Sequence, residues 1–408
     1  MKVEEYRNYF PGLETESGGR TMVYLDNAAT SQRCIGTIER LRQLEISHNA
    51  NVHRSVYALA SDATKVYEDT REYVREYINA PSREEIVFTS GATFSLNLVA
   101  YSWGERHIKS GDSILVCVSE HHSNLVPWQL LAQRKGAEIR VIPVDERGEI
   151  LLDEYERLFD GRTRLVCVAQ ISNVLGIVTP IKEMIRIAHN HGALVLVDGA
   201  QGIVHTKVDV RDMDCDFYAF SGHKIFAATG TGVLYARKSL LMDMDPFLSG
   251  GEMIGTVSFE RTTFADIPYR FEAGTPNFNS IPTLTDGIEM LRLGLEDKEL
   301  RSNLTGIKDF VYNALKSNPD IRILGEPQDL NCKIPLFSFV VKGVHHEDLA
   351  ILLDKMGVAA RSGHACAEPL MDRFGITGML RVSFAPYNTM EEAQYFIRCL
   401  DRAIKMLS

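Results

Sequence analysis

Two polar residues directly follow apolar runs that resemble β-strands. Lys224 ends the sequence Ser-Gly-His-Lys after the run 217–220, and Asp198 follows the run 194–197. A lysine at a strand end in a partly desolvated cleft can lose its proton and act as an amine nucleophile. An ionised carboxylate in such a place can keep a ring nitrogen protonated. Taken singly, each residue also has an ordinary explanation, as a surface lysine or as the N-cap of a helix.

A third feature is the small-residue turn Ser90-Gly91-Ala92, which lies between an apolar run and a helical pattern. Such a turn points backbone N–H groups and a helix dipole at one spot, which suits a phosphate. Its spacing matches neither the dinucleotide pattern GxGxxG nor the Walker pattern, and alone it is better explained as a capped strand-to-helix turn. A phosphate cradle, an acid and a lysine at successive strand ends together predict a pyridoxal phosphate site.

The elements that position these residues alternate between strands and helices. Strands are predicted at 85–89, 113–119, 139–143, 165–170, 194–197, 217–220 and 232–235. Helices are predicted at 92–107, 127–135, 153–158 and 181–191. This alternation is typical of an α/β domain with a largely parallel sheet, whose ligands bind beyond the carboxyl ends of the strands.

After residue 283 the predicted elements differ in length and order from those before it. Long helices are predicted at 284–295 and 300–316, and shorter elements follow at 336–341, 348–356, 381–383 and 391–407. We therefore expect a large domain over 21–285 and a smaller C-terminal α+β domain over 286–408. The first twenty residues are expected to pack on the smaller domain.

The composition excludes several classes of protein. The 408 residues are 45% hydrophobic and 24% charged, as in an ordinary globular protein, and the net charge is −10. An acidic balance argues against binding to nucleic acid or to an anionic membrane. The apolar runs are too short to span a bilayer and the N-terminus has no signal pattern, so we expect a cytoplasmic protein. Seven cysteines without CxxC or zinc-finger spacing predict free thiols and no metal site.

Several motifs give the chain a wider resemblance, which extends from residue 24 to residue 389. They are YLDNAAT at 24–30, ANVHR at 50–54, EHHSN at 120–124, SNVLG at 172–176, DGAQ at 198–201, SGHK at 221–224, FEAGTPN at 271–277 and RSGHAC at 361–366. The chain resembles the SufS-type (group II) cysteine desulfurases and the closely related selenocysteine lyases. These are fold-type I pyridoxal phosphate enzymes of the class V aminotransferase group. The resemblance implies a large domain with a mostly parallel seven-stranded sheet and a smaller C-terminal domain.

The resemblance implies cofactor roles for eight residues. Lys224 matches the lysine that holds the cofactor as a Schiff base, and Asp198 matches the partner of the pyridinium nitrogen. His121 matches a histidine that stacks on the ring and is proposed to move protons. Gln201 matches the residue that binds the phenolic oxygen of the ring. The phosphate ligands match Thr93, Ser221, His223 and Thr275, the last of which comes from the other subunit of a homodimer in the family.

The resemblance also implies how the substrate is handled. Arg381 and Asn173 match the clamp for the substrate carboxylate, and Arg361 and His53 match residues at the mouth of the site. Cys366 matches the cysteine that forms a persulfide, and its cationic neighbours favour the thiolate that attacks sulfur. The implied reaction converts L-cysteine to L-alanine. The sulfur then passes to an acceptor protein for iron–sulfur cluster assembly.

Three alternatives stay open at this point. A selenocysteine lyase would act on L-selenocysteine and need no cysteine nucleophile. The second alternative is another class V reaction, and the thiol in RSGHAC argues against it because such a reaction does not need a thiol there. The third is a protein that binds a partner without any cofactor, and the presence of Lys224 and Asp198 argues against it. The chain departs from the family at Ala365, which replaces a histidine, at 227–228, where Ala-Ala replaces Gly-Pro, and at Glu347. Glu347 stands where relatives with a zinc-containing acceptor have a histidine, and so argues against such an acceptor.

Overall fold

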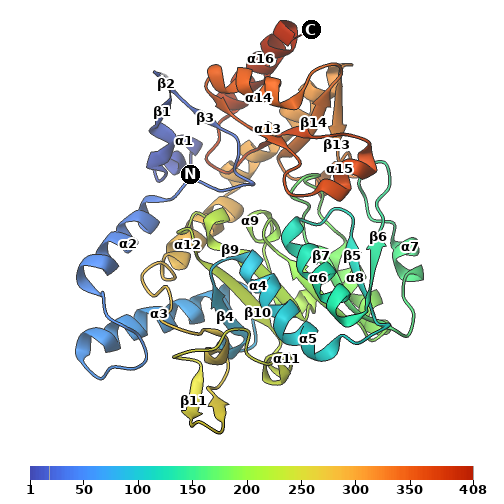
Figure 1. Ribbon diagram of the computed structural model, residues 1–408. Helices are drawn as coiled ribbons and strands as arrows, with labels where there is room; N and C mark the ends of the chain where they lie inside the picture. The colour runs from blue at the N-terminus through green and yellow to red at the C-terminus, as the bar shows by residue number, and fades with distance from the viewer. Residues whose placement is uncertain (18, 408) are drawn as a thin grey trace.

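The centre of the molecule is a seven-stranded sheet (Figure 1), in a computed structural model that describes residues 1–17 and 19–407. Gly18 and Ser408 lie outside the described residues. Gly18 belongs to the N-terminal segment that was expected to pack on the smaller domain, and Ser408 to that domain itself. The strand order is β4 (Ile86–Thr89), β10 (Gly232–Ala236), β9 (Phe217–Ser221), β8 (Leu194–Asp198), β7 (Thr163–Ala169), β5 (Ser113–Cys117) and β6 (Glu138–Ile142). Only β10 in this sheet runs antiparallel to its neighbours. The prediction of a mostly parallel seven-stranded sheet is therefore confirmed, with every strand within two residues of its predicted bounds.

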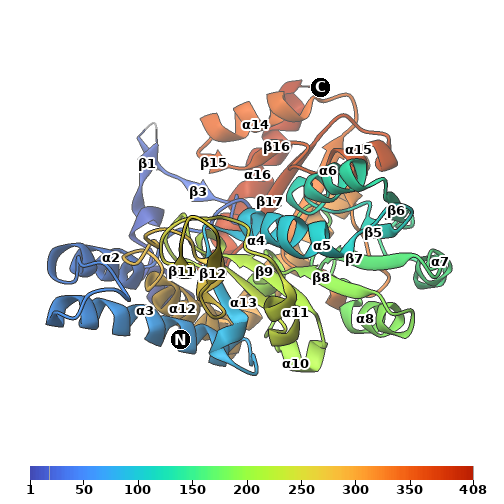
Figure 2. The same ribbon diagram turned by 60° about the horizontal axis from the view of Figure 1, so that its bottom comes forward.

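Helices cover both faces of this sheet because its strands are apolar on both faces. In β9, Phe217 and Ala219 belong to one buried cluster, and Tyr218 and Phe220 belong to another. The first cluster includes residues of α4 (Ala92–Val99) and α6 (Val126–Lys135). The second includes residues of α3 (Ala58–Tyr77), α8 (Ile181–Asn190) and α12 (Thr283–Glu296). The sheet is thus the middle layer of three, as the views in Figures 1 and 2 show.

The helix predicted at 92–107 is not a single α-helix. After α4 the chain forms a π-helical stretch, Ala100–Gly104, before the short α5 (Glu105–His107). At Gly104 a Cβ atom would lie 2.5 Å from Leu131 Cδ2 of α6, so this stretch approaches the neighbouring helix closely. The predicted bounds of the helical stretch are confirmed, but periodicity does not register the wider turn at Ala100–Gly104.

The C-terminal part forms a four-stranded antiparallel sheet with its own core (top of Figure 1). Its strands are β13 (Ile321–Leu324), β14 (Leu336–Val341), β17 (Met379–Ser383) and β16 (Arg361–Gly363). Its helices include α13 (Lys298–Ser317), α14 (His346–Lys355), α15 (Glu368–Phe374) and α16 (Met390–Leu407). We call this sheet the small sheet.

The N-terminal segment contacts this C-terminal part. The terminal amino group of Met1 lies 2.9 Å from Asp297 Oδ2, and Arg7 of α1 (Val3–Arg7) pairs with Glu392 at 2.9 Å. Further along, β3 (Val23–Tyr24) pairs in parallel with β15 (Val358–Ala359). The predicted boundary between residues 285 and 286 falls inside α12, which packs on α2 (Ile35–Ser47) and α3. We propose that the two domains divide between α12 and α13, at Asp297.

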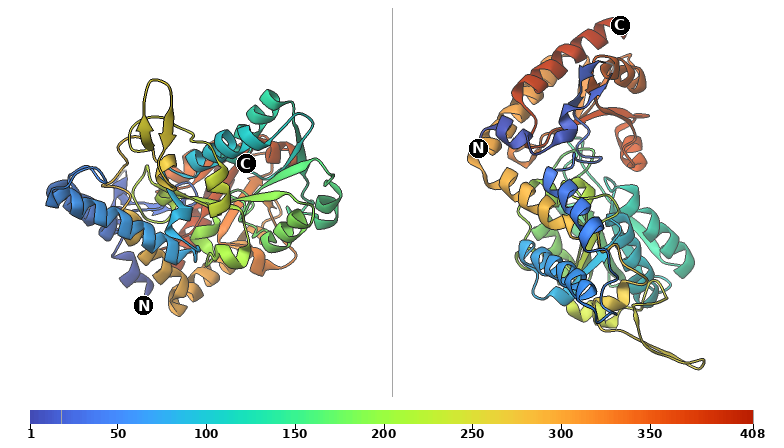
Figure 3. Two further views of the ribbon diagram at one scale, coloured as in Figure 1. Left: turned by 90° about the horizontal axis from the view of Figure 1, so that it is seen from below. Right: turned by 90° about the vertical axis from the view of Figure 1, so that its left-hand side faces the viewer.

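Several elements gave no clear signal in the sequence. They include α2, α3, α9 (Gly202–His205), α10 (Val210–Met213), α11 (Lys238–Asp243), β1 (Glu16–Ser17) and β2 (Arg20–Thr21), whereas the helix predicted at 153–158 is present as α7 (Leu152–Arg157). A separate hairpin of β11 (Ile254–Val257) and β12 (Thr262–Phe264) projects away from the rest of the molecule (yellow in Figure 3), and Phe259 at its tip is fully exposed. No helix in the described ranges is both long enough and apolar enough to cross a membrane.

Candidate active site

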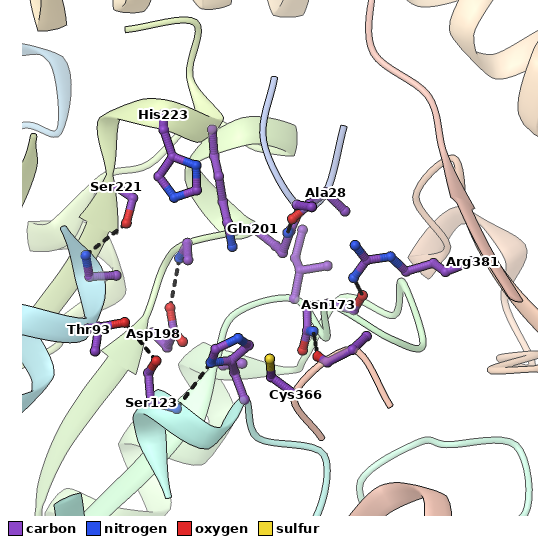
Figure 4. Close-up of a pocket in the computed structure, with 18 of the residues that line it drawn as sticks. Ala28, Thr93, Ser123, Asn173, Asp198, Gln201, Ser221, His223, Cys366 and Arg381 are labelled. Atoms are coloured by element: carbon purple, nitrogen blue, oxygen red, sulfur yellow. Dashed lines mark hydrogen bonds between the residues drawn. The ribbon is translucent and has the colours of Figure 1, made fainter. Parts of the chain in front are cut away.

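A cavity of about 180 Å³ lies beyond the carboxyl ends of the parallel strands, where the large sheet meets the small sheet (Figure 4). The loops after β4, β5, β7, β8 and β9 form one wall, and residues between 361 and 381 form the other. Eleven of the thirteen residues predicted for the site line this cavity. They are Thr93, His121, Asn173, Asp198, Gln201, Ser221, His223, Lys224, Arg361, Cys366 and Arg381.

Lys224 and Asp198 lie in the wall that the large sheet provides. Asp198 is 6% exposed at the end of β8, and its Oδ1 accepts a hydrogen bond of 2.9 Å from the backbone N–H of Ala200. Burial raises the pKa of Asp198, whereas the neighbouring Lys224 lowers it. Desolvation lowers the pKa of Lys224 to about 8, against the opposing effect of Asp198. More of Lys224 is therefore a neutral, nucleophilic amine near neutral pH than of an ordinary lysine.

A cradle for an anion lies at the start of α4. The backbone N–H of Ala92 donates to Ser221 Oγ over 2.8 Å, and Thr93 Oγ1 lies 2.7 Å from Ser123 Oγ. Gly91 precedes the helix with a φ of +150°, a conformation that favours glycine. Hydroxyl groups and a helix N-terminus suit a phosphate group. Burial, with Lys224 nearby, lowers the pKa of His223 to about 4, so its imidazole is neutral.

Two side chains in this wall fit an aromatic ring that carries a hydroxyl group. Gln201 Nε2 donates to the carbonyl of Ala28 over 2.8 Å, while the buried Oε1 has no hydrogen-bond partner among the described residues. A ring hydroxyl could supply the missing donor. His121 Nδ1 accepts from the backbone N–H of Ser123 over 3.1 Å, which assigns the proton of the neutral ring to Nε2. Burial is the largest cause that lowers the pKa of His121, to about 4.

Arg381 provides the cationic part of the opposite wall. It is 2% exposed, Nη1 donates to the carbonyl of Asn173 over 2.8 Å, and Nη2 donates to Asp26 Oδ1 over 3.1 Å. Its buried Nε has no partner among the described residues. Arg361 Nη1 lies 3.8 Å from Asp26 Oδ2, so one carboxylate lies between both arginines. Sequence reasoning missed Asp26, although it is part of the YLDNAAT motif.

Cys366 lies on a loop with unusual backbone geometry. Ala365 and Cys366 have φ values of 46° and 57°, and two consecutive residues other than glycine rarely occupy this left-handed region. Asn173 Nδ2 donates to the carbonyl of Ala365 over 2.9 Å, and the N–H of His122 donates to the carbonyl of Cys366 over 2.7 Å. These contacts hold the strained turn in place. In Figure 4 the sulfur of Cys366 points into the cavity, beside Asn173.

Cys366 is the only described cysteine that lines this cavity. Five others, Cys34, Cys117, Cys167, Cys215 and Cys399, are buried, and burial raises the pKa of the first four. Cys332 is partly exposed and lies outside the cavity. The sequence predicted buried, inert thiols at these six positions, and Cys332 differs from this prediction because it is partly exposed.

Two predicted residues lie away from the cavity in this chain. His53 Nε2 lies 3.0 Å from Glu68 Oε1, and its ring packs edge-on against Tyr67 and Tyr269. Thr275 is exposed on the segment that precedes α12. The resemblance assigned Thr275 to a neighbouring subunit, so its distance from the cavity in one chain does not conflict with that role.

The backbone approach of Gly232 to Gly91 gives a testable prediction. A Cβ atom on Gly232 would lie 2.4 Å from Gly91 Cα and 2.6 Å from Gly91 N. Gly232→Ala must therefore displace the anion cradle, and we expect it to lower the free energy of unfolding by about 2–3 kcal/mol. Urea denaturation measures this loss. Gly161→Ala is a suitable control because a Cβ atom there has no neighbour within 4 Å, and equal stability of the two variants would contradict the prediction.

Comparisons with known proteins agree with this geometry. The family described as Aminotransferase class-V matches residues 23–396. A protein named probable cysteine desulfurase from Vibrio cholerae serotype O1 is 43% identical over 407 residues, which cover all of both chains. The cysteine desulfurase CsdA from Escherichia coli, in an S-sulfonic acid form, superimposes with a TM-score of 0.91 at 39% identity, over all of both chains. The apo cysteine desulfurase from Thermococcus onnurineus NA1 gives a TM-score of 0.93 at 36% identity, over all of this chain and 99% of the other.

Proposed function

Since the chain belongs to the class V aminotransferase family, we propose that it converts L-cysteine to L-alanine and leaves the sulfur as a persulfide on Cys366. It is a pyridoxal-phosphate-dependent cysteine desulfurase with the fold of fold-type I enzymes. One observation carries the proposal: Lys224, Arg381 and Cys366 line the same cavity from three separate elements. An amine, a carboxylate-binding cation and a thiol are the groups that this reaction needs.

The residues present fit the cofactor. Lys224 would hold its aldehyde, Asp198 its ring nitrogen, and Ser221, Thr93 and His223 its phosphate, and Gln201 Oε1, which has no partner among the described residues, could accept a hydrogen bond from its hydroxyl. When bound, pyridoxal phosphate supplies a ring that withdraws electrons from the α-carbon of the substrate. A neighbouring subunit would add Thr275, which explains its exposed position in the single chain.

The substrate needs a carboxylate partner and two proton-transfer groups. Arg381 is held on two sides, by Asn173 O and Asp26, and its remaining donors can bind the carboxylate in a bidentate manner. The Lys224 amine can take the α-proton because its pKa of about 8 leaves part of it unprotonated. His121 can donate a proton from Nε2, since its Nδ1 is occupied by Ser123 N–H.

Cys366 carries the sulfur transfer. Its thiolate attacks the sulfur of the substrate, so that an S–S bond forms and the bond between that sulfur and Cβ breaks. The carbon keeps the electron pair and takes up a proton, which yields L-alanine. The persulfide then passes to an acceptor protein of iron–sulfur cluster assembly. We place this homodimeric enzyme in the cytoplasm, where thiols stay reduced.

Anaerobic incubation of the purified protein with L-cysteine tests the proposal. We expect one L-alanine per sulfur released and, in a single turnover, a persulfide label on the peptide that contains Cys366. The same assay with L-selenocysteine measures the preference between sulfur and selenium. A protein that forms no alanine, or that carries the label elsewhere, contradicts the proposal.

The lowered pKa of Lys224 predicts how cofactor loading depends on pH. Only the neutral amine reacts with an aldehyde, so the loading rate should rise with pH, reach half its maximum near pH 8 and level off above it. Absorbance after pyridoxal phosphate is added to the cofactor-free protein measures this rate. Asp198→Asn should move the midpoint downward, because Asp198 raises the pKa of Lys224. A rate that still climbs steeply above pH 9 would indicate an ordinary lysine.

A further inference from the structure

Lys333 is a buried lysine that the proposed reaction does not use. It is 3% exposed between a 3₁₀ turn (Leu330–Cys332) and β14, and lysines are almost never this buried unless they are paired. Its Nζ donates to the carbonyl of Leu175 over 2.6 Å and to the carbonyl of Gly325 over 2.8 Å. Nζ also lies 5.5 Å from the centre of the Phe337 ring. Burial lowers the pKa of Lys333 to about 7, and Glu326 acts in the opposite direction.

The two carbonyls belong to chain segments that approach each other closely. A Cβ atom on Gly325 would lie 2.5 Å from Leu175 O, and one on Gly176 would lie 2.9 Å from Leu336 O. Both glycines have positive φ values, of 77° and 62° respectively. Carbonyl oxygens that converge in a buried place need a donor between them, and the amino group of Lys333, which has N–H donors in either protonation state, is that donor.

Leu175 lies in the SNVLG turn at 172–176, whose other polar groups bind the small sheet and the Cys366 loop. Asn173 O accepts from Arg381 Nη1, and Val174 O accepts from Ser338 Oγ over 2.6 Å. Ser338 and Arg381 are partners in register across β14 and β17, and Arg361 of β16 is the next partner. Ser338 and Arg381, which are paired across the small sheet, therefore both donate to this turn. Asn173 Nδ2 extends the contact to the carbonyl of Ala365.

We propose that Lys333 is a positioning residue that fixes the SNVLG turn against the small sheet and thereby sets the places of Arg381 and the Cys366 loop. Lys333 lies outside the cavity and acts through Leu175. Without the amino group of Lys333, the backbone bonds of Gly176 to Ile334 and of Val178 to Cys332 remain, but the bond at Leu175 is lost. Asn173, two residues away, then holds both Arg381 and Ala365 less tightly. The expected change in KM rests on the proposed function. The expected change in the mobility of the turn rests on the contacts alone.

The test compares Lys333→Met with Lys333→Arg in the cofactor-loaded enzyme. Methionine keeps an unbranched side chain without a donor, and arginine keeps donors for two carbonyls. For Lys333→Met we expect KM for L-cysteine to rise about tenfold and amide hydrogen exchange at 172–178 and 362–367 to quicken about tenfold. Lys333→Arg should restore both to within about twofold of the original enzyme. Exchange in α16 should stay unchanged in both variants.

Lys308→Met is the matched control, because Lys308 Nζ also donates to a backbone carbonyl, that of Leu330 over 3.0 Å, but does not touch the turn. It should leave KM and exchange unchanged. If Lys333→Met does not fold, Lys333→Gln, which keeps one donor group, is measured by the same criteria. A merely structural lysine would lower the melting temperature and leave KM within twofold, which would overturn the proposal. If the original enzyme forms no alanine, the proposed function fails, and hydrogen exchange still decides the role of Lys333.

Discussion

Cys366→Ala should reduce the formation of L-alanine from L-cysteine by about a thousandfold or more, because the variant has no nucleophile in the cavity to accept the sulfur. No other described cysteine lines that cavity, and four of the remaining thiols are buried with raised pKa values. Another thiol therefore cannot take over the reaction. Chromatographic measurement of alanine under anaerobic conditions gives the rate. Cofactor absorbance should be unchanged, since Lys224 and Asp198 are intact.

Cys332→Ala is the control for this result. Cys332 is partly exposed and lies outside the cavity, so its removal should leave the rate unchanged. L-selenocysteine extends the experiment, because selenium can leave without a thiol acceptor. If Cys366→Ala keeps its activity towards L-selenocysteine and loses it towards L-cysteine, the thiol is needed for sulfur alone. Full activity of Cys366→Ala towards L-cysteine would contradict the proposed role of this residue.

Lys224→Arg should abolish turnover, by about ten-thousandfold or more, although the positive charge is kept. A guanidinium group stays protonated, so it can neither condense with an aldehyde nor remove the α-proton. The neutral fraction of Lys224 exists because desolvation lowers the pKa of this amine to about 8. The visible absorption of the loaded enzyme should disappear together with the alanine-forming activity. The absorption spectrum and the rate of alanine formation can be measured on the same preparation of the variant.

Arg361→Lys is the comparison for Lys224→Arg, since it changes a cation in the same cavity without touching the amine. We expect it to keep the visible absorption and to raise KM for L-cysteine by about tenfold at most. Retention of the absorption band in Lys224→Arg would mean that another amine holds the cofactor. Lys333 is the other described lysine whose pKa burial lowers, but its Nζ is bonded to two carbonyls outside the cavity.

The sequence predicted the part of the fold that follows from simple periodicity. The strands of the large sheet are continuous apolar runs bounded by polar residues, such as 194–197 before Asp198, so their bounds were predictable. The π-helical stretch at Ala100–Gly104 was not, because it depends on how closely α4 and α6 approach. The helices α2 and α3 were missed because their apolar positions lie among many charged residues.

In the candidate site too, some residues could be predicted from the sequence and others could not. Residues at strand ends, such as Asp198 and Lys224, could be inferred from local pattern, and Arg381 and Cys366 from motifs. Asp26 and Lys333 could not be inferred, because their roles depend on contacts across more than 150 positions of sequence, with Arg381 and Leu175. A carboxylate or a lysine in a sequence gives no sign of which distant carbonyl or guanidinium it meets. Such contacts emerge only from the packing of the two sheets.

The carboxylate of Asp26, placed between Arg381 and Arg361, has a consequence for which molecules the cavity admits. Two guanidinium groups would attract dianions strongly, whereas with Asp26 between them the local balance is a single positive charge. That balance matches an amino acid with one carboxylate and a small neutral side chain. Asp26 therefore keeps the two arginines from forming a doubly charged anion site, while Arg381 keeps donors for one substrate carboxylate.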